Sequence, residues 1–218
     1  KGQTVLMTAA RTGNVAAVRV LLDRGADVNV KESQLGETAL MWAASENHAD
    51  VVTLLAIRGA DVNARSAVVQ FPKDRFGLEG VLTILPHGNW TPLMYAARDG
   101  GVDSARALAK AGADVNATAP DGTTPLMLAI MNAHYDTANA ILEAGADPKS
   151  KDSHGLTPFL KSAMYGHLEI AEKLLARGAG RGPPGVPAPS PAHLVGGRRL
   201  ARPRRPPGRC GPRAHRPR

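Results

Sequence analysis

The sequence predicts an all-α solenoid of five stacked helix-turn-helix repeats with hairpin loops, and three regularities of the 218-residue chain support this fold class. A threonine recurs at intervals of 34, 53, 33 and 33 residues. Apolar residues with helical spacing follow each threonine, and each such stretch ends in a Gly-Ala turn. The threonines are Thr4, Thr38, Thr91, Thr124 and Thr157. A period near 33 residues is typical of stacked helical pairs.

Each threonine is expected to begin the first helix of its repeat. Its hydroxyl can accept a hydrogen bond from a backbone N–H of the first turn. At three of the five sites proline follows, at the one helical position that tolerates it: Pro92, Pro125 and Pro158. In the first repeat Leu6, Ala9 and Ala10 fall at positions i, i+3 and i+4 and therefore share one buried face.

The second helix of each repeat is expected to bury a similar face and to end at glycine. Val18, Leu21 and Leu22 form this face in the first repeat. Gly25 can adopt the left-handed conformation that ends a helix. The aspartates that follow the Gly-Ala dipeptides are interpreted as turn residues: Asp27, Asp61, Asp114 and Asp147. Because one helix pair cannot bury both of its faces, neighbouring pairs must stack.

These motifs resemble the ankyrin repeat family, whose pattern reads G-x-T-P-L-H-x-A-A, then G-H, then an apolar helix that ends in L-L-x-x-G-A-D-V-N. Residues 91–97 (Thr-Pro-Leu-Met-Tyr-Ala-Ala) and 124–127 (Thr-Pro-Leu-Met) match the first half, and residues 166–179 match the second half. The chain is also similar to bacterial ankyrin arrays. The resemblance implies repeats at about 2–32, 33–65, 88–117, 118–150 and 151–180 within a repeat domain of residues 1–180, with an insertion at 66–87.

The sequence differs from the family pattern where the family places histidine. Methionine or leucine occupies that position: Met7, Met41, Met94, Met127 and Leu160. We expect these methionines to be buried in register, so that packing replaces the polar contacts of histidine.

Neither catalysis nor cofactor or metal binding is expected. The sequence contains no nucleophile, phosphate-loop or paired-carboxylate motif. His48, His134 and His167 recur at one inter-helix turn, so stacking would place them in a row and not around a metal. The single cysteine, Cys210, excludes an intrachain disulfide and a cysteine-based zinc site.

The family resemblance implies that a protein or peptide partner engages the concave side, which the hairpin tips and the first helices form. Positions four, seven and eight after each threonine share one stripe of the first helix. This stripe, with the adjacent Trp90, predicts the following partner-binding residues: Trp42, Ser45, Glu46, Trp90, Tyr95, Arg98, Asp99, Met131, Asn132, Lys161 and Tyr165. Trp, Tyr and Arg dominate interface energies. The alternative for Trp42 and Tyr95 is that they fill gaps left by alanines.

The insertion at 66–87 contains many apolar residues, among them Phe71 and Phe76. Long ordered loops on a rigid scaffold frequently carry function. One interpretation is therefore a structured flap over the concave side, in which Phe71 and Phe76 contact the partner. The other is a finger that only packs back on the third repeat.

Charge is distributed unevenly along the chain. The net charge is +8, yet residues 1–180 contain 17 basic and 19 acidic side chains. Residues 181–218 contain ten arginines, no acidic residue and ten of the 17 prolines, a composition that predicts disorder. Three interpretations of this tail are open: an arginine-rich arm for nucleic acid or anionic surfaces, a solvated tail, and a frameshift product, because the repeat pattern stops after Ala179.

The leading hypothesis is a non-catalytic, monomeric protein-interaction module that binds a protein or peptide with its groove and inserted finger. The alternatives are a basic-tailed binder of nucleic acid or anionic surfaces, and the scaffold part of a larger enzyme. No apolar run is long enough to span a membrane. The chain begins without methionine, so we expect a fragment of a longer array, and the sequence leaves the compartment open.

Overall fold

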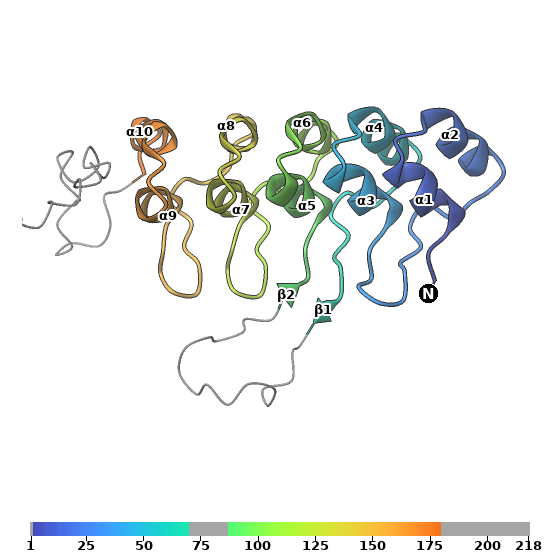
Figure 1. Ribbon diagram of the computed structural model, residues 1–218, viewed down its shortest axis with the longest axis horizontal. Coiled ribbons are helices and arrows are strands. Elements are labelled where there is room, and N and C mark those ends of the chain that lie inside the picture. Colours follow the sequence, from blue (N-terminus) through green and yellow to red (C-terminus); the bar gives the residue numbers. More distant parts are fainter. Residues whose placement is uncertain (1, 70–86, 180–218) are drawn as a thin grey trace, which may run out of the picture. The chain divides into compact units, whose positions relative to one another are not determined.

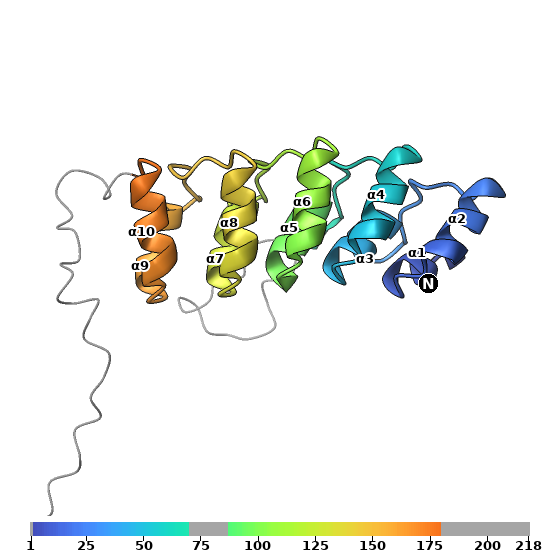
Figure 2. The same ribbon diagram turned by 90° about the horizontal axis from the view of Figure 1, so that it is seen from above.

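The computed structural model describes residues 2–69 and 87–179, and in these residues ten helices form five pairs arranged in two layers (Figures 1 and 2). The first-helix layer contains α1 (Val5–Arg11), α3 (Ala39–Ser45), α5 (Pro92–Asp99), α7 (Pro125–Met131) and α9 (Pro158–Met164). The second-helix layer contains α2 (Val15–Asp23), α4 (Ala49–Ile57), α6 (Val102–Lys110), α8 (Tyr135–Glu143) and α10 (Leu168–Ala176). Each helix packs on its partner and on the neighbouring helices of its own layer. The predicted all-α solenoid is confirmed.

Threonine begins the first helix of each pair as the sequence predicts, with one exception. The hydroxyl oxygen of the threonine accepts a hydrogen bond of 3.2–3.3 Å from the N–H three residues later at Thr4, Thr38, Thr124 and Thr157. At α5 the Met94 N–H donates instead to the carbonyl oxygen of Thr91, at 2.9 Å. The hydroxyl of Thr91 is consequently buried without a partner.

Glycine ends the second helix of each pair because of its backbone conformation. The φ angle lies between 81° and 98° at Gly25, Gly59, Gly112, Gly145 and Gly178. Residues other than glycine rarely adopt such values. At Gly25 no heavy atom lies within 4 Å of the position that a Cβ would occupy, so the conformation and not the available space requires glycine there.

Histidines at the inter-helix turns contact the preceding helix pair. The ring of His48 lies only 2.6 Å from where a Cβ on Gly13 would be, and its Nε2 is 3.0 Å from the carbonyl oxygen of Arg11. The His167 Nδ1 lies 2.6 Å from the Tyr135 hydroxyl. The predicted role as turn residues is therefore confirmed, and within the described residues no group of three His, Cys, Asp or Glu side chains could hold a metal ion.

The core lies between the layers and between successive pairs. Met7, Met41, Met94 and Met127 are at most 1% exposed, as predicted, whereas Leu160 at the fifth such position is half-buried. Val18 is buried, but Leu21 and Leu22 are only half-buried. Leu55, the α4 counterpart of Leu21, is fully buried because α2 packs on α4.

The long loops that project below the first-helix layer in Figure 1 are stabilised chiefly by side chain–backbone hydrogen bonds. Strand pairing in the described residues is limited to β1 (Val68–Val69) and β2 (His87–Gly88), which are antiparallel. In all four loops the predicted turn aspartate accepts the N–H two residues later, as in Asp61 with Asn63 at 2.9 Å.

Asparagines link each loop to the next one along the stack. The Oδ1 atom accepts the N–H of the following turn aspartate at 2.8 Å in three pairs: Asn29–Asp61, Asn63–Asp114 and Asn116–Asp147. Asn63 also donates its side-chain N–H to the carbonyl oxygen of Gly112, at 3.4 Å. The insertion lies between Asn63 and Asp114, so the same link is maintained across it.

We expect Asn63→Ala to lower the free energy of unfolding by about 1–2 kcal/mol, because it removes two solvent-exposed hydrogen bonds between loops. Urea unfolding followed by circular dichroism measures this change. The control is Gln34→Ala, which shortens an exposed amide side chain in another loop. An equal stability of the two variants would contradict a linking role for Asn63.

Candidate functional site

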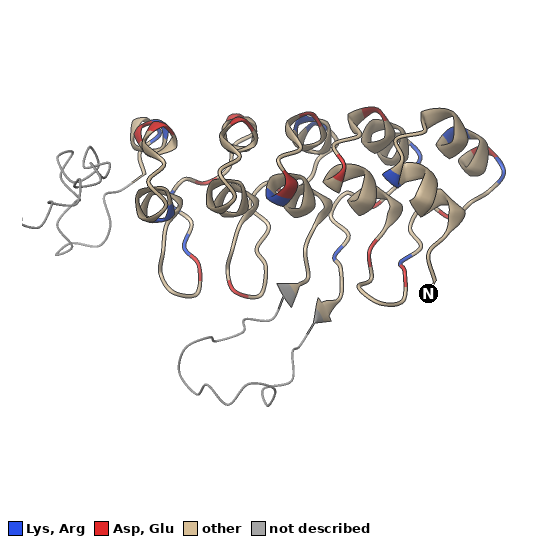
Figure 3. Cartoon of the chain, viewed as in Figure 1, with Lys and Arg blue, Asp and Glu red and all other residues tan. Residues whose placement is uncertain are grey.

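A groove of about 680 Å³ lies where the loops α2–α3, α4–α5 and α6–α7 meet the helices α5 and α7. Its apolar wall consists of Leu35, Ala67, Gly88, Trp90, Tyr95, Leu128 and Met131. Its polar groups come from Glu37, Ser66, Arg98, Asp121, Thr123 and Asn132. Since α3 and α7 carry no charged residue, the charges that face the groove come from α5 and from the loops (Figure 3).

A smaller cavity of about 210 Å³, which we call the Trp42 pocket, adjoins the groove. It is lined by Arg11, Glu37, Met41, Trp42, Ser45, Glu46, Tyr95 and Arg98. Glu37, Tyr95 and Arg98 line both cavities. The groove and the Trp42 pocket therefore form one continuous candidate surface.

The guanidinium of Arg98 makes cation–π contacts with two aromatic rings beside the groove. It lies 5.3 Å from the ring centroid of Trp90 and 5.1 Å from that of Tyr95. Trp90 and Tyr95 contact each other edge to face, with centroids 5.6 Å apart. Asp99 accepts two hydrogen bonds from Arg98, of 2.8 and 2.7 Å, and one of 2.6 Å from Ser45. These contacts hold the guanidinium in a single position.

The ionisation of this cluster follows from the same contacts. The Asp99 carboxylate raises the pKa of Arg98. Burial alone would raise the pKa of Asp99, but hydrogen bonds from Arg98 and Ser45 hold it below its ordinary value. Burial and the nearby Glu37 carboxylate raise the pKa of Tyr95. Arg98 and Asp99 are thus a charged pair at neutral pH, and the Tyr95 phenol remains protonated.

Trp42 is half-buried at the edge of its pocket. Its Nε1–H donates a 2.8 Å hydrogen bond to Glu37, and the guanidinium of Arg11 lies 5.2 Å from the ring centroid. Glu37 is half-buried as well, and among the described residues no cation lies within ion-pair distance of its carboxylate. Trp42 therefore has both an exposed edge and a structural contact.

The structure brings most of the predicted partner-binding residues together. Trp42, Ser45, Glu46, Tyr95 and Arg98 line the Trp42 pocket, and Asp99 holds Arg98. Trp90, Met131 and Asn132 line the groove. Tyr95 is only 6% exposed and packs with Met41 and Ala64, so the interpretation that it fills space describes it better than direct exposure. The predicted sites Phe71 and Phe76, and the predicted disordered tail at 181–218, lie outside the described residues.

Lys161 is a correction to the predicted stripe. Its ammonium forms a 2.8 Å ion pair with Asp152, and the two side chains are 9% and 3% exposed. Asp152 belongs to the loop that precedes α9, and this loop covers the stripe position that helical spacing alone assigns to solvent. Lys161 is therefore a structural residue and lines neither cavity.

Tyr165 also lies apart from the groove. It is 50% exposed, and its ring stacks on that of His167 with the centroids 5.9 Å apart. It lines neither the groove nor the Trp42 pocket.

The helical stripe missed several residues of the groove that come from the loops, among them Leu35, Glu37, Asp121 and Thr123. One signal in the sequence could have found two of them. The residue directly before the capping threonine faces the groove in three successive repeats: Glu37, Trp90 and Thr123. Only Trp90 was predicted from its position.

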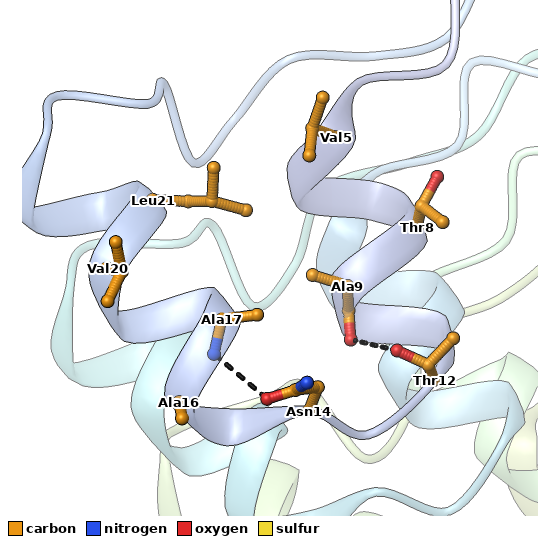
Figure 4. A pocket seen from close by; sticks show the side chains of 9 residues that line it. All are labelled: Val5, Thr8, Ala9, Thr12, Asn14, Ala16, Ala17, Val20 and Leu21. Atoms are coloured by element: carbon orange, nitrogen blue, oxygen red, sulfur yellow. Dashed lines mark hydrogen bonds between the residues drawn. The ribbon is translucent and has the colours of Figure 1, made fainter.

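A third cavity of about 560 Å³ opens between α1 and α2 (Figure 4). Val5 and Val20 line it and are 70% and 51% exposed. Its polar groups bond to their own backbone: Thr12 donates to the carbonyl oxygen of Ala9, and Asn14 accepts the N–H of Ala17. This surface corresponds to the one on α3 and α4 that the first pair covers, so it is a stacking face without convergent polar groups.

The match to known proteins agrees with this architecture. The family model for ankyrin repeats matches the chain in three copies, over residues 1–66, 76–152 and 121–182. The chain therefore belongs to the ankyrin repeat family. No curated protein matches it significantly. Within the part of the chain that the structure describes, no helix is sufficiently long and apolar to cross a membrane.

We expect Lys161→Met to lower the free energy of unfolding by about 3–5 kcal/mol, because it leaves the Asp152 carboxylate buried without its cation. Combining it with Asp152→Asn should recover much of this loss, since no unpaired charge then remains. Urea unfolding of Lys161→Met, of Asp152→Asn and of the double variant provides the measurement. Additive losses in the double variant would contradict the proposed coupling.

The ion pair also predicts a pH dependence. Burial by itself raises the pKa of Asp152, but Lys161 and the backbone N–H groups of Leu156 and His154 lower it below the ordinary value of 3.8. A carboxylate whose pKa is lower in the folded state than in the unfolded state stabilises the fold at pH values above its unfolded-state pKa. This contribution disappears as the pH falls through the folded-state pKa. The stability difference between the unaltered chain and Asp152→Asn should therefore shrink as the pH falls below the ordinary value of 3.8. A constant difference across urea titrations in this range would exclude the mechanism.

Proposed function

We propose that this chain is a non-catalytic interaction module that binds a protein or peptide segment in the groove and the adjoining Trp42 pocket. Ankyrin repeats generally mediate protein–protein interaction, and the family is typically non-catalytic. The observation that carries the proposal is the groove itself, whose volume of about 680 Å³ is in the range of ligand-binding sites.

The composition of the groove supports binding. Its wall is largely apolar, and the aromatic and arginine side chains beside it are of the types that dominate interface energies. Asp99 and the two rings already restrain Arg98, so little side-chain entropy would be lost when a partner covers it. A preformed surface of this kind needs little rearrangement to bind a segment of another chain.

The proposal concerns the groove and not the other predicted elements. Phe71, Phe76 and the arginine-rich tail lie outside the described residues, and no described residue favours nucleic-acid binding over protein binding. The residues of the groove and the Trp42 pocket that we assign to the partner contact are Trp42, Glu46, Trp90, Arg98, Met131 and Asn132.

The test is to select a random peptide library displayed on phage against the full chain and to measure the affinity of enriched peptides by fluorescence anisotropy. Ala67→Trp places a bulky ring at an exposed position of the groove wall and should weaken binding at least about tenfold. The matched control, Ala144→Trp, makes the same change at an exposed position on the side of the second-helix layer and should leave the affinity unchanged.

Circular dichroism must first show that both tryptophan variants retain the helical content of the unaltered chain. If no peptide is enriched, or if enriched peptides bind both variants equally well, the groove is not the binding site and the proposal fails.

A further inference from the structure

We infer that the groove selects an extended peptide segment in which a lysine or arginine is adjacent to a large apolar side chain. This inference rests on the proposed function and specifies the chemistry of the partner. It is based on two carboxylates, Glu37 and Asp121, that line the groove and form no ion pair with any described residue.

Glu37 and Asp121 are half-buried and come from two different loops. Glu37 accepts one hydrogen bond of 2.8 Å, from Trp42. Asp121 accepts two from Thr123, of 3.0 Å from the N–H and 2.7 Å from the hydroxyl. Neither carboxylate belongs to an ion pair with any described residue. Glu37 also interacts with the Tyr95 hydroxyl and, at longer range, with the charge of Arg98, and each carboxylate keeps further acceptor capacity on the groove side.

Two other carboxylates, the exposed Asp99 and the buried Asp152, show how this chain compensates negative charge with its own cations. Asp99 is paired with Arg98, and Asp152 is paired with Lys161. A partner that covers the groove would exclude water from Glu37 and Asp121. Because an unpaired buried carboxylate is strongly unfavourable, the partner must supply the compensating cations.

The described cations that line the two cavities, Arg11 and Arg98, already have other partners. Asp99 and two aromatic rings restrain Arg98, and Arg11 lies over the ring of Trp42. Of the charged side chains that line the two cavities, three are acidic, namely Glu37, Glu46 and Asp121, and two are basic, namely Arg11 and Arg98, of which Arg98 is neutralised by Asp99. Charge complementarity thus favours a basic partner over an acidic one.

The rest of the groove wall is largely apolar. Leu35, which is 44% exposed, and the side chains of Trp90, Leu128 and Met131 form it. A leucine, methionine or phenylalanine side chain suits this wall, while an adjacent lysine or arginine can reach Glu37 or Asp121. An extended conformation follows from the layout, because the groove runs across three successive loops of the stack.

The experiment compares three full-length proteins with the same phage-displayed random peptide library. They are the unaltered chain, the double variant Glu37→Gln/Asp121→Asn, and the control Asp103→Asn/Glu143→Gln. The groove variant removes two charges while its amide oxygens can still accept the hydrogen bonds from Trp42 and Thr123. The control removes two exposed charges from the second-helix layer.

Peptides selected on the unaltered chain should be enriched in a basic residue next to a large apolar one. Their affinity should fall at least about tenfold on Glu37→Gln/Asp121→Asn, because charge-assisted hydrogen bonds are lost, and should be unchanged in the control. Variants are compared only after circular dichroism shows equal helical content.

Consider peptides whose binding Ala67→Trp weakens. If they lack a basic residue, or if they bind Glu37→Gln/Asp121→Asn as tightly as the unaltered chain, the inference is overturned while the proposed function stands. Selection of peptides that are rich in aspartate and glutamate would likewise overturn the inference and leave the proposed function standing. If the selected peptides bind Ala67→Trp as tightly as the unaltered chain, the proposed function is refuted, and the inference with it.

Discussion

The links between successive loops are the constraint on which the arrangement of the repeats depends. Asn29, Asn63 and Asn116 each bind the backbone N–H of the next turn aspartate at the same distance, 2.8 Å. These bonds hold neighbouring loops at one spacing, in register with the helices that pack directly on one another above them. The second link spans the insertion, so α3 and α5 pack as direct neighbours although more residues separate them along the chain than separate α1 and α3 or α5 and α7. A groove that crosses three loops exists because the insertion leaves this spacing undisturbed.

The same loops place acidic side chains in environments that differ in which groups compensate the negative charge of the carboxylate. Glu32 is buried and accepts hydrogen bonds from the N–H groups of Gln34, Leu35 and Glu37, and these N–H groups lower its pKa although burial alone would raise it. Asp152 is buried and has Lys161. Glu37 and Asp121 have only partial hydrogen bonding, and they remain half-exposed at the groove. The carboxylates that the chain itself compensates are therefore structural, and the two that it compensates only in part are those assigned to the proposed partner contact.

Helical periodicity predicted the candidate site well where helices alone decide exposure. The positions after each threonine identified Trp42, Ser45, Glu46, Arg98, Met131 and Asn132, all of which line a cavity. The same rule misplaced Lys161, because it ignores the loop that carries Asp152 across the last first helix. It also could not weigh Tyr95, whose burial depends on Trp90 and on residues of the preceding repeat. The loop residues of the groove, Leu35 and Asp121 among them, have no helical period and were not found.

By itself the sequence determined the repeat, the helices and the buried methionine row, because threonine caps, glycine termini and apolar spacing act within a few residues of each other. Only the tertiary structure decided which carboxylates have cations, which stripe positions the loops cover, and that loops from three repeats converge on one groove. The reason is physical: the convergence of the loops depends on contacts between residues of different repeats, which exist only after the pairs have stacked in register, and the Asp152–Lys161 pair depends on how a loop folds back over its own helix.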